Sequence, residues 1–572
     1  MENLSDHDFI IDGWKVTPAD GLLTREGESV RLEPKVMDVL VYFASHPGEV
    51  ISRMELEREV WRGAVVGYDA VSATVIKLRK ALQDKARNPH IIATIPKKGY
   101  KLIATVTFVD IGEKETASPK VQSSDTPVSS PHSAAESSAQ TSTQKRPSFN
   151  LQMTVAIALM AIALAITWTK TGKQSLNVMP SLVVLPIENL DANNQYDVFL
   201  DGITDDIITD LSRLSSLKVF ASATTFKYKG QQISPQSLRQ EINADFVLSG
   251  SARRHGDDIR INVQLAETKN GQNIWAQRYD QNVIDIFDLQ DTIAKSLIEA
   301  LAIEVLPKEK HNISQRATKN LKAYEYFLEG QRISRDQTKQ SNALAREAYL
   351  QAVETDPAYG RAYGALAYIL ALDYRHGWTD SPIENLDHAL SLAEKGVALN
   401  SSIPQTYWSL SYVHLRRNEY EAALKAAEES IKVSPNYADG YGLLALISNG
   451  LGQADKALAY ATRGMQLNPY YTWDYLFNVG YSHYLLGDYT KAIESLQKAG
   501  ARNENALPVK LFLAAAYAHT GRLDDAEWMV DQIGMLNSAT TISHIANTVT
   551  QSDPKLKSML IEDLRKAGLP EE

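Results

Sequence analysis

The sequence predicts a multidomain chain: a small α+β domain, one membrane-spanning helix, an α/β domain and an all-α array of repeated helix pairs. Three observations lead to this prediction. Residues 151–169 form an uninterrupted apolar run, and strand-like and helix-like patterns alternate on both sides of it. Beyond residue 320, small residues return with a period near 34. With 572 residues, the chain has room for three or four domains.

The apolar run, LQMTVAIALMAIALAITWT, contains no charged residue, proline or glycine. A helix rises about 1.5 Å per residue, so about 20 such residues span a hydrocarbon core of about 30 Å while satisfying their own backbone groups. The alternative is a buried helix of a soluble domain, which is usually shorter and carries scattered polar residues. A cleaved signal peptide is excluded because about 150 residues precede the run. We therefore predict a transmembrane helix over residues 151–169.

Composition excludes several classes of chemistry. The chain has no cysteine, so it forms no disulfide, thiol nucleophile or cysteine-bound zinc site. It shows no serine–histidine–aspartate arrangement, phosphate-binding loop or HExxH helix. We predict a protein that is not an enzyme, with no catalytic residue, metal or cofactor. The net charge of −10 would by itself argue against nucleic acid, but the charge is distributed unevenly.

Residues 1–107 carry the pattern of a small α+β domain. The alternating runs FIIDGWKV and ESVRL predict short antiparallel strands. Helices are predicted from Pro34 to His46, after the capping residue Ser52, and from about Asp69 to Gln83. The strands HIIATI and YKLIATV follow, joined by a PKKG turn.

Charge divides this domain into two parts. Residues 1–69 hold seven basic and fourteen acidic residues, whereas residues 70–105 hold eight basic residues against Asp84 alone. A basic patch attracts phosphates, and a helix with Thr74, Lys77 and Lys80 on its outward side would fit a major groove. The alternative, a solvated basic face, is usual for a charge run alone. The helix–turn–helix and hairpin around this patch favour DNA binding.

These residues resemble a known family. The stretches RLEPKVMDVLVYFASHPGEVISRMELEREVW, DAVSATVIKLRKALQD and IIATIPKKGYKLIA are similar to the winged-helix effector domain of OmpR-type regulators, particularly the CadC/ToxR-like membrane-bound branch. The resemblance implies a recognition helix around Ser72–Lys80 and a wing tip at Lys97 and Lys98. Ile76 departs from the polar or basic residue of many members, so base preference does not transfer. No receiver domain precedes this segment, so control by aspartyl phosphorylation is not expected. The expected DNA-binding residues are Ser72, Thr74, Lys77, Arg79, Lys80, Lys97, Lys98 and Lys101.

Residues 108–150 are rich in Ser, Thr, Pro, Gln and Ala and predict a flexible linker. A coil of about 40 residues spans roughly 35 Å, which lets the DNA-binding domain leave the bilayer surface. Basic residues flank residues 151–169 on both sides, so the positive-inside rule does not set the orientation. Because a DNA-binding domain must face the cytoplasm, we predict a single-pass inner-membrane protein whose C-terminal region is periplasmic.

Residues 178–308 predict an α/β domain. Strands are expected at SLVVLPIENL and KVFASA, helices at GITDDIITDLSRL and SPQSLRQEINA, and three antiparallel strands after them, with turns at His255-Gly256 and Asn270-Gly271. The segment resembles the TolB-like N-terminal domain that accompanies repeat arrays in membrane-bound regulators and some nucleotide cyclases, which implies no catalytic residue.

Four aspartates in the first of these helices suggest metal ligands, but the next position on the face of Asp201 and Asp205 is Ile208, which is no ligand. Carboxylates early in a helix are also favoured by its dipole. We therefore predict a solvated helix start. The four residues are Asp201, Asp205, Asp206 and Asp210.

Residues 320–540 repeat themselves. The turn positions Asn418, Gly452, Gly487 and Gly521 are 34, 35 and 34 residues apart, with small residues seven before and five after each. This is the pattern of tetratricopeptide (TPR) repeats, in which small side chains let paired helices cross closely. We predict a solenoid of about six helix pairs, with an inserted loop near Asp373–Pro382, and a C-terminal helical tail over residues 541–572.

Such an array presents a groove for a protein or peptide. Tyr407 and Tyr441 share a repeat position, and an aromatic cluster lies at Tyr470–Tyr475, although such residues are more often buried in the core. His414 and His483 also share a position. Because histidine titrates near about pH 6.5, acid sensing is one hypothesis, and simple packing is the more common alternative.

The sequence thus predicts a membrane-tethered one-component transcription regulator. Its expected partners are double-stranded promoter DNA, the inner membrane, a protein or peptide in the repeat groove, and a second copy on DNA. The alternative is an envelope scaffold whose repeats assemble other proteins, with DNA binding secondary.

Overall fold

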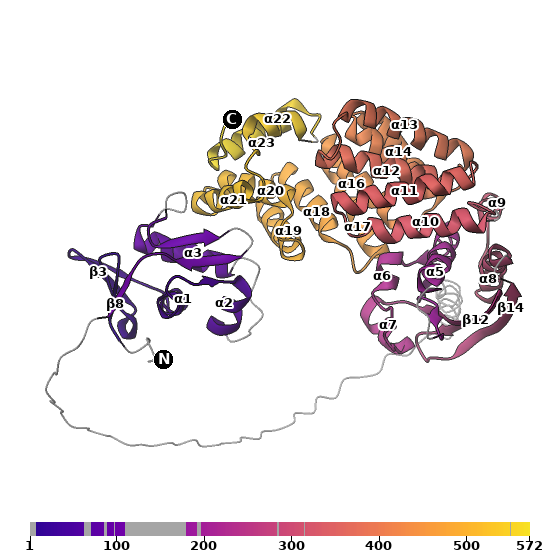
Figure 1. The fold of residues 1–572 in the computed structure, drawn as a ribbon, viewed down its shortest axis with the longest axis horizontal. Coiled ribbons are helices and arrows are strands. Elements are labelled where there is room, and N and C mark those ends of the chain that lie inside the picture. Colours follow the sequence, from indigo (N-terminus) through magenta and orange to yellow (C-terminus); the bar gives the residue numbers. More distant parts are fainter. Residues whose placement is uncertain are drawn as a thin grey trace, which may run out of the picture. The chain divides into compact units, whose positions relative to one another are not determined.

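The computed structural model places most of the chain, drawn in Figure 1. Within the described residues, no helix is long and apolar enough to cross a membrane. The predicted spanning run 151–169 and nearly all of the predicted linker lie outside the described residues. The described ranges are 7–61, 70–84, 89–95, 98–108, 179–191, 196–282, 285–313, 315–549 and 551–572.

Residues 7–108 form the N-terminal α+β domain that the sequence predicts. A five-stranded antiparallel sheet has the order β4-β3-β2-β1-β8, and a three-stranded sheet has the order β5-β7-β6. The elements are β1 (Phe9–Ile11), β2 (Trp14–Thr17), β3 (Leu22–Arg25), β4 (Glu28–Arg31), α1 (Pro34–Ser45), β5 (Val50–Ile51), α2 (Arg53–Val60), α3 (Ala70–Leu82), β6 (Ile92–Ile95), β7 (Gly99–Leu102) and β8 (Val106–Phe108).

Local chemistry explains the shape of this domain. The Ser52 hydroxyl accepts a hydrogen bond from the backbone N–H of Glu55 at 3.1 Å and so starts α2, as the sequence predicts. Trp14 is fully buried, and its indole N–H donates to the carbonyl oxygen of Leu82, which fixes the first sheet against the end of α3. Gly99 is required at the β6–β7 hairpin, because its φ is +135° and a Cβ there would lie 2.0 Å from the carbonyl oxygen of Ile51.

The second domain is an α/β domain, as predicted, and it is built on a mixed sheet. Its order is β11-β9-β12-β13-β14, with β10 beside β12; β9, β11 and β12 run parallel, and β12, β13 and β14 form an antiparallel meander. The elements are β9 (Ser181–Val184), β10 (Glu188–Asn189), α5 (Asp197–Leu211), β11 (Lys218–Val219), α6 (Ser222–Phe226), α7 (Pro235–Ile242), β12 (Phe246–His255), β13 (Asp258–Glu267), β14 (Asn273–Asn282), α8 (Ile286–Ala300) and α9 (Pro307–Ile313).

Six antiparallel helix pairs follow and confirm the predicted repeats. The pairs are α10 (Leu321–Ser334) with α11 (Lys339–Thr355), α12 (Gly360–His376) with α13 (Pro382–Leu399), α14 (Pro404–Arg416) with α15 (Tyr420–Val433), α16 (Ala438–Gly450) with α17 (Ala454–Leu467), α18 (Trp473–Leu485) with α19 (Tyr489–Arg502), and α20 (Leu507–His519) with α21 (Leu523–Leu536). The tail holds α22 (Ile542–Thr548) and α23 (Pro554–Lys566).

The repeat positions do what the pattern requires. All four predicted turn residues have left-handed backbone, with φ of +62° at Asn418 and +73°, +76° and +75° at the three glycines. At Gly480 an added Cβ would lie 2.6 Å from Leu496 Cγ, so the helices of that pair cross too closely for a larger residue. The expected loop near Asp373–Pro382 is shorter than predicted, since α12 continues to His376.

The second domain and the first repeats share one hydrophobic core, which runs from Leu182 on β9 to Ile447 on α16. Polar contacts join them as well. The Ser212 and Ser434 hydroxyls are 2.6 Å apart, and the Asn436 side-chain amide donates to the carbonyl oxygen of Leu217 at 2.7 Å. The later helix pairs and the tail pack in turn on their neighbours along the array. Residues 179–572 therefore fold as one block, apart from the few undescribed positions within that range.

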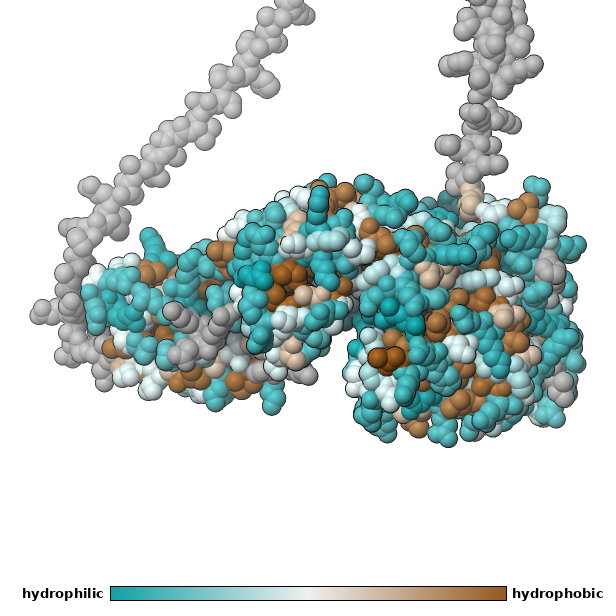
Figure 2. All heavy atoms as spheres, turned by 90° about the horizontal axis from the view of Figure 1, so that it is seen from above, coloured by the Kyte–Doolittle hydropathy of each residue, from teal (hydrophilic) through white to brown (hydrophobic). Residues whose placement is uncertain are grey.

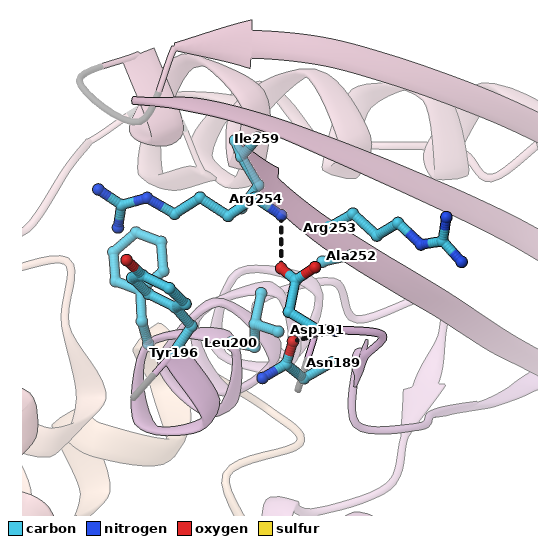
Figure 3. A pocket seen from close by; sticks show the side chains of 9 residues that line it. Asn189, Asp191, Tyr196, Leu200, Ala252, Arg253, Arg254 and Ile259 are labelled. Atoms are coloured by element: carbon cyan, nitrogen blue, oxygen red, sulfur yellow. Dashed lines mark hydrogen bonds between the residues drawn. The ribbon is translucent and has the colours of Figure 1, made fainter. Parts of the chain in front are cut away.

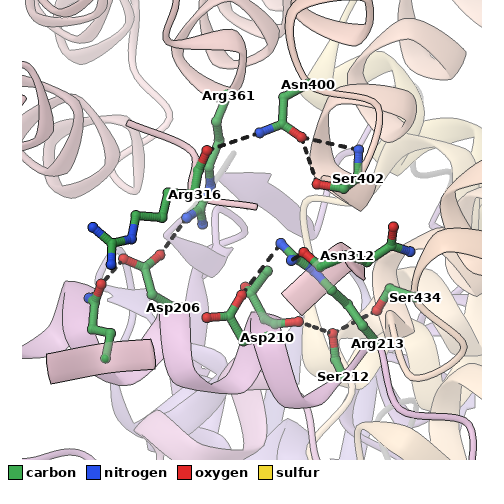
Figure 4. A network of polar contacts seen from close by, with 12 residues as sticks. Asp206, Asp210, Ser212, Arg213, Asn312, Arg316, Arg361, Asn400, Ser402 and Ser434 are labelled. Carbon is green, nitrogen blue, oxygen red and sulfur yellow. Dashed lines mark hydrogen bonds and ion pairs between the residues drawn. The ribbon is translucent and has the colours of Figure 1, made fainter. Parts of the chain in front are cut away.

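An ion-pair network lies at this junction (Figure 4). The Arg361 guanidinium of α12 donates to Asp206 at 2.6 Å and to Asp205 at 2.8 Å, both on α5. Burial opposes the charge of Arg361, but the two carboxylates outweigh it and hold its pKa above the ordinary value. The prediction of a solvated helix start at these aspartates was therefore wrong, because α5 packs its acidic face against the repeats.

We predict that Arg361→Ala lowers the free energy of unfolding of this block by about 3–5 kcal/mol, because it leaves two carboxylates without their cation in a buried junction. Thermal or urea unfolding of the full chain measures the change. Lys229→Ala is the matched control: Lys229 pairs with Asp201 at 2.7 Å but is 43% exposed. Its loss should cost about 0–1 kcal/mol, and equal losses in the two variants would contradict the prediction.

Candidate nucleic-acid interface

The third helix and the β6–β7 hairpin lie side by side in the N-terminal domain. Val71, Val75 and Leu78 form the buried stripe of α3, and the opposite side of the helix carries the exposed residues Lys77 and Lys80. On the hairpin, Lys98 is exposed at the turn and Lys101 is half-buried on β7. The structure thus presents lysines on both parts of the predicted DNA-binding surface.

Thr74 and Arg79, two of the predicted DNA contacts, are buried in the domain. Thr74 is buried, because positions 71, 74, 75 and 78 follow helical spacing and lie on one face. The expectation that Thr74 points outward with Lys77 was therefore wrong. The side chain of Ser72 and all of Lys97 lie outside the described residues, so their roles stay predictions.

Arg79 is used inside the domain. One of its guanidinium nitrogens donates to the carbonyl oxygen of Ile92 and to the Thr94 hydroxyl, each at 2.8 Å. Burial lowers the pKa of this guanidinium below its ordinary value. Arg79 therefore fixes the angle between α3 and strand β6, which sets the spacing between the helix and the hairpin turn.

Lys77 has a partner within the domain. Its ammonium donates to both carboxylate oxygens of Glu33, at 2.8 and 2.9 Å, and both side chains are more than half exposed. Glu33 precedes α1 and brings a negative charge to the middle of the basic surface. The Glu33 carboxylate therefore competes with a DNA phosphate for the Lys77 ammonium.

The comparisons with known proteins agree with this geometry. Residues 27–102 match the family described as "Transcriptional regulatory protein, C terminal", and residues 177–296 match the second domain of HilA/YgeH-like transcriptional regulators. Residues 404–437 and 484–539 match tetratricopeptide repeat families.

Two curated relatives are transcriptional activators. The transcriptional activator CadC of Escherichia coli (strain K12) is 26% identical over 389 residues, which cover 62% of this chain and 73% of CadC. The cholera toxin transcriptional activator of Vibrio cholerae serotype O1 is 30% identical over 186 residues, which cover 29% of this chain and 63% of that activator. The chain thus resembles CadC and the cholera toxin transcriptional activator over these matched segments.

A third relative carries a different name. The putative adenylate cyclase 3 of Rhizobium meliloti (strain 1021) is 34% identical over 236 residues, 41% of this chain and 40% of that protein. The chain thus spans less than half of this relative, and less than two thirds of the cholera toxin activator.

The aspartates of α5 are engaged in protein contacts. Asp201 binds Lys229, Asp205 and Asp206 bind Arg361, and Asp210 lies 3.4 Å from Arg213. Burial raises the pKa of Asp210 to about 7. Among the described residues, no group of three or more histidine, aspartate or glutamate side chains is arranged to hold a metal ion.

The hollows among the described residues of 179–572 include two that lie in or beside the second domain. One, of about 510 Å³, lies at the junction network and is lined by Asp210, Arg213, Arg316 and Tyr359 among others. The second, of about 220 Å³, is drawn in Figure 3. There the Asp191 carboxylate accepts the backbone N–H of Arg254 at 2.7 Å, and the Arg254 guanidinium packs on the Tyr196 ring. These contacts join strand β12 to the start of α5.

An aromatic cluster on the first helices of two repeats was missed by the sequence analysis. Tyr368 of α12 lies 5.1 Å from both Trp408 and Tyr412 of α14, and Arg375 donates to the Tyr412 hydroxyl at 3.3 Å. Trp408 is only partly buried and Arg375 is exposed. Tyr368 and Arg375 of α12 are more than 30 residues from Trp408 and Tyr412 of α14, so no local pattern joins the two pairs.

The predicted aromatic cluster at residues 470–475 and the two predicted histidines differ in their surroundings. Tyr475 is buried, and the Tyr470 hydroxyl donates to Glu241 of α7 at 2.9 Å, so these rings serve packing and the domain junction. His414 lies 2.6 Å from a Glu419 oxygen, whereas burial lowers the pKa of His483. The two histidines have different surroundings, and acid sensing by them stays a prediction.

We predict that Glu33→Gln tightens binding of the full chain to a labelled duplex by up to about fivefold at low salt, since an exposed ion pair contributes about 0–1 kcal/mol and Lys77 no longer has to leave it. Fluorescence anisotropy measures the affinity. Asp12→Asn, which removes a charge from the exposed β1–β2 turn, is the control. If both variants bind alike, general charge and not the Lys77 contact sets the affinity.

Proposed function

We propose that the chain is a membrane-tethered one-component transcription regulator: its N-terminal domain binds promoter DNA in the cytoplasm, and its C-terminal block senses a signal or a partner protein beyond the inner membrane. The observation that carries the proposal is the winged-helix domain with exposed lysines on both α3 and the hairpin turn. The match of that domain to a transcriptional regulatory family supports it.

For DNA binding, we propose direct phosphate or base contacts for Lys77, Lys80 and Lys98, which are exposed. Lys101, Ser72 and Lys97 complete the proposed surface. Thr74 and Arg79 act on it from within, because both side chains are buried and Arg79 bonds to β6. A helix with outward lysines in the major groove and a hairpin near the backbone is the expected docking geometry.

For the tether, the supporting observation is the run 151–169, which has the length and apolarity of a spanning helix. For sensing, the supporting observation is the block of helix repeats. Tyr368 and Trp408 are partly exposed beside the exposed Arg375, and they offer aromatic faces and one cation to a protein or peptide with apolar and acidic side chains. The buried Tyr412 packs against both rings from within. We propose that this cluster is part of the partner surface, and that no catalytic step is involved.

The second candidate function is an envelope scaffold. Six stacked helix pairs that share a core with the second domain are the observation that favours it. Deleting residues 179–572 separates the two: loss of a sensor changes transcription of a target locus, whereas loss of a scaffold disturbs an envelope complex without that change.

We predict that the triple variant Lys77→Ala, Lys80→Ala, Lys98→Ala of the full chain binds duplex DNA more weakly, with a salt dependence shallower by about 0.9 per lost phosphate contact. Titrations of duplex at several salt concentrations measure the slope. The control is Lys15→Ala, which removes a lysine that pairs with Asp8 at 2.9 Å on the first sheet. An unchanged slope in the triple variant would refute DNA binding by this surface.

The tether has its own test. Reporter enzymes fused after residue 108 and after residue 572 should be active in opposite compartments. Activity of both reporters in one compartment would remove the membrane and sensing parts of the proposal and leave DNA binding standing.

A further inference from the structure

Strand β14 ends the six-stranded sheet. It pairs with β13 from Asn273 to Asn282, with one register shift at Ile274, and within the described residues no strand pairs with its other side. Its ten residues, NIWAQRYDQN, include no proline or glycine. Helix α8 covers the core face, where the Tyr279 hydroxyl lies 3.4 Å from Ser296 Oγ. An edge of this length leaves a row of backbone N–H and C=O groups available to another strand.

The solvent face of β14 carries opposite charges two residues apart. The carboxylate of Asp280 pairs with Arg260 of β13 at 2.5 Å and with Arg278 of its own strand at 3.1 Å. The side chains of Arg260, Asp280 and Arg278 are 56%, 47% and 64% exposed, so they lie on the open side of the sheet. Arg278 and Asp280 share a face because side chains alternate along a strand.

We propose that β14 pairs antiparallel with β14 of a second copy, about a twofold axis through Tyr279. In that register Arg278 of each copy lies opposite Asp280 of the other, and Gln277 lies opposite Gln281. An axis through Arg278 or Asp280 would instead place like charges opposite each other, which destabilises a strand pair. The charge pattern therefore selects one self-complementary register, as a twofold interface requires.

This pairing goes beyond the proposed function and does not depend on DNA binding. It forms a continuous sheet across two copies and supplies the second chain that a paired DNA-binding unit needs. Two linked DNA-binding domains gain effective concentration on tandem half-sites.

Cross-linking tests the register. The chain has no cysteine, so introduced thiols have no background. Directly opposite residues of antiparallel strands have Cα atoms about 4.5–5.5 Å apart, within the range that a disulfide spans. Full-length Arg278→Cys and Asp280→Cys chains with tags of different size, mixed in detergent micelles and mildly oxidised, should give a heterodisulfide. The mismatched mixture of Arg278→Cys with Ala276→Cys is the control and should not.

Charge exchange tests the interaction itself. Arg278→Asp or Asp280→Arg alone should weaken self-association of the full chain about tenfold or more, and the double variant should restore it to within about threefold, because the opposite pairs are re-formed in reverse. Arg260→Gln, which removes a partner of Asp280 on β13, should change it by less than about threefold. Analytical ultracentrifugation in micelles gives the constants, and circular dichroism checks the fold.

A monomeric full chain at all concentrations, a cross-link in the mismatched mixture as fast as in the matched one, or a double variant as weak as the single ones would overturn the pairing. Binding of each variant to a duplex with a single half-site is measured in parallel. That affinity should stay unchanged, so loss of pairing and loss of DNA binding are told apart.

Discussion

The contact between Arg361 and two aspartates of α5 determines how most of the chain is organised. The Arg361 side chain is only 6% exposed. A buried guanidinium that loses its carboxylate partners strongly destabilises the fold. The contact therefore commits α5 of the second domain to α12 of the repeats. Around it, the two regions bury a common apolar core and exchange hydrogen bonds such as that between Ser212 and Ser434. A domain boundary drawn from sequence at about residue 308 or 320 separates elements that are packed together.

The N-terminal domain divides its cations between two tasks. Arg79 is buried and ties α3 to β6, which suits a planar guanidinium that bonds to a carbonyl and a hydroxyl at once. Lysines occupy the exposed positions, where a flexible charge meets phosphate without a fixed geometry. Glu33 reduces the positive charge of this surface, because it pairs with Lys77 when no phosphate is bound. On the face of the molecule seen in Figure 2, hydrophilic residues predominate and hydrophobic residues form small patches.

The sequence predicted those parts of the fold that depend on local spacing. The repeats were found because a turn with left-handed backbone favours glycine or asparagine, and four such residues recur at one period. The helix cap at Ser52 and the meander turns at Gly256 and Gly271 follow the same logic. What failed depends on distant partners: Arg361 and Asp206 are 155 residues apart in the chain, so a helix start that looks solvated is in fact buried. The predicted outward orientation of Thr74 was wrong because this residue lies at the border of the buried stripe of α3.

The common core of the second domain and the first repeats has a mechanical consequence. A rigid body without an internal hinge rotates as a whole when a force acts at one end. If a bound partner rotates the block at Trp408, strand β14 therefore turns through the same angle. Displacement then grows with distance from the pivot, as in a lever arm. Stiffness of the junction, and not softness of a loop, would set how faithfully such a rotation is passed along the protein.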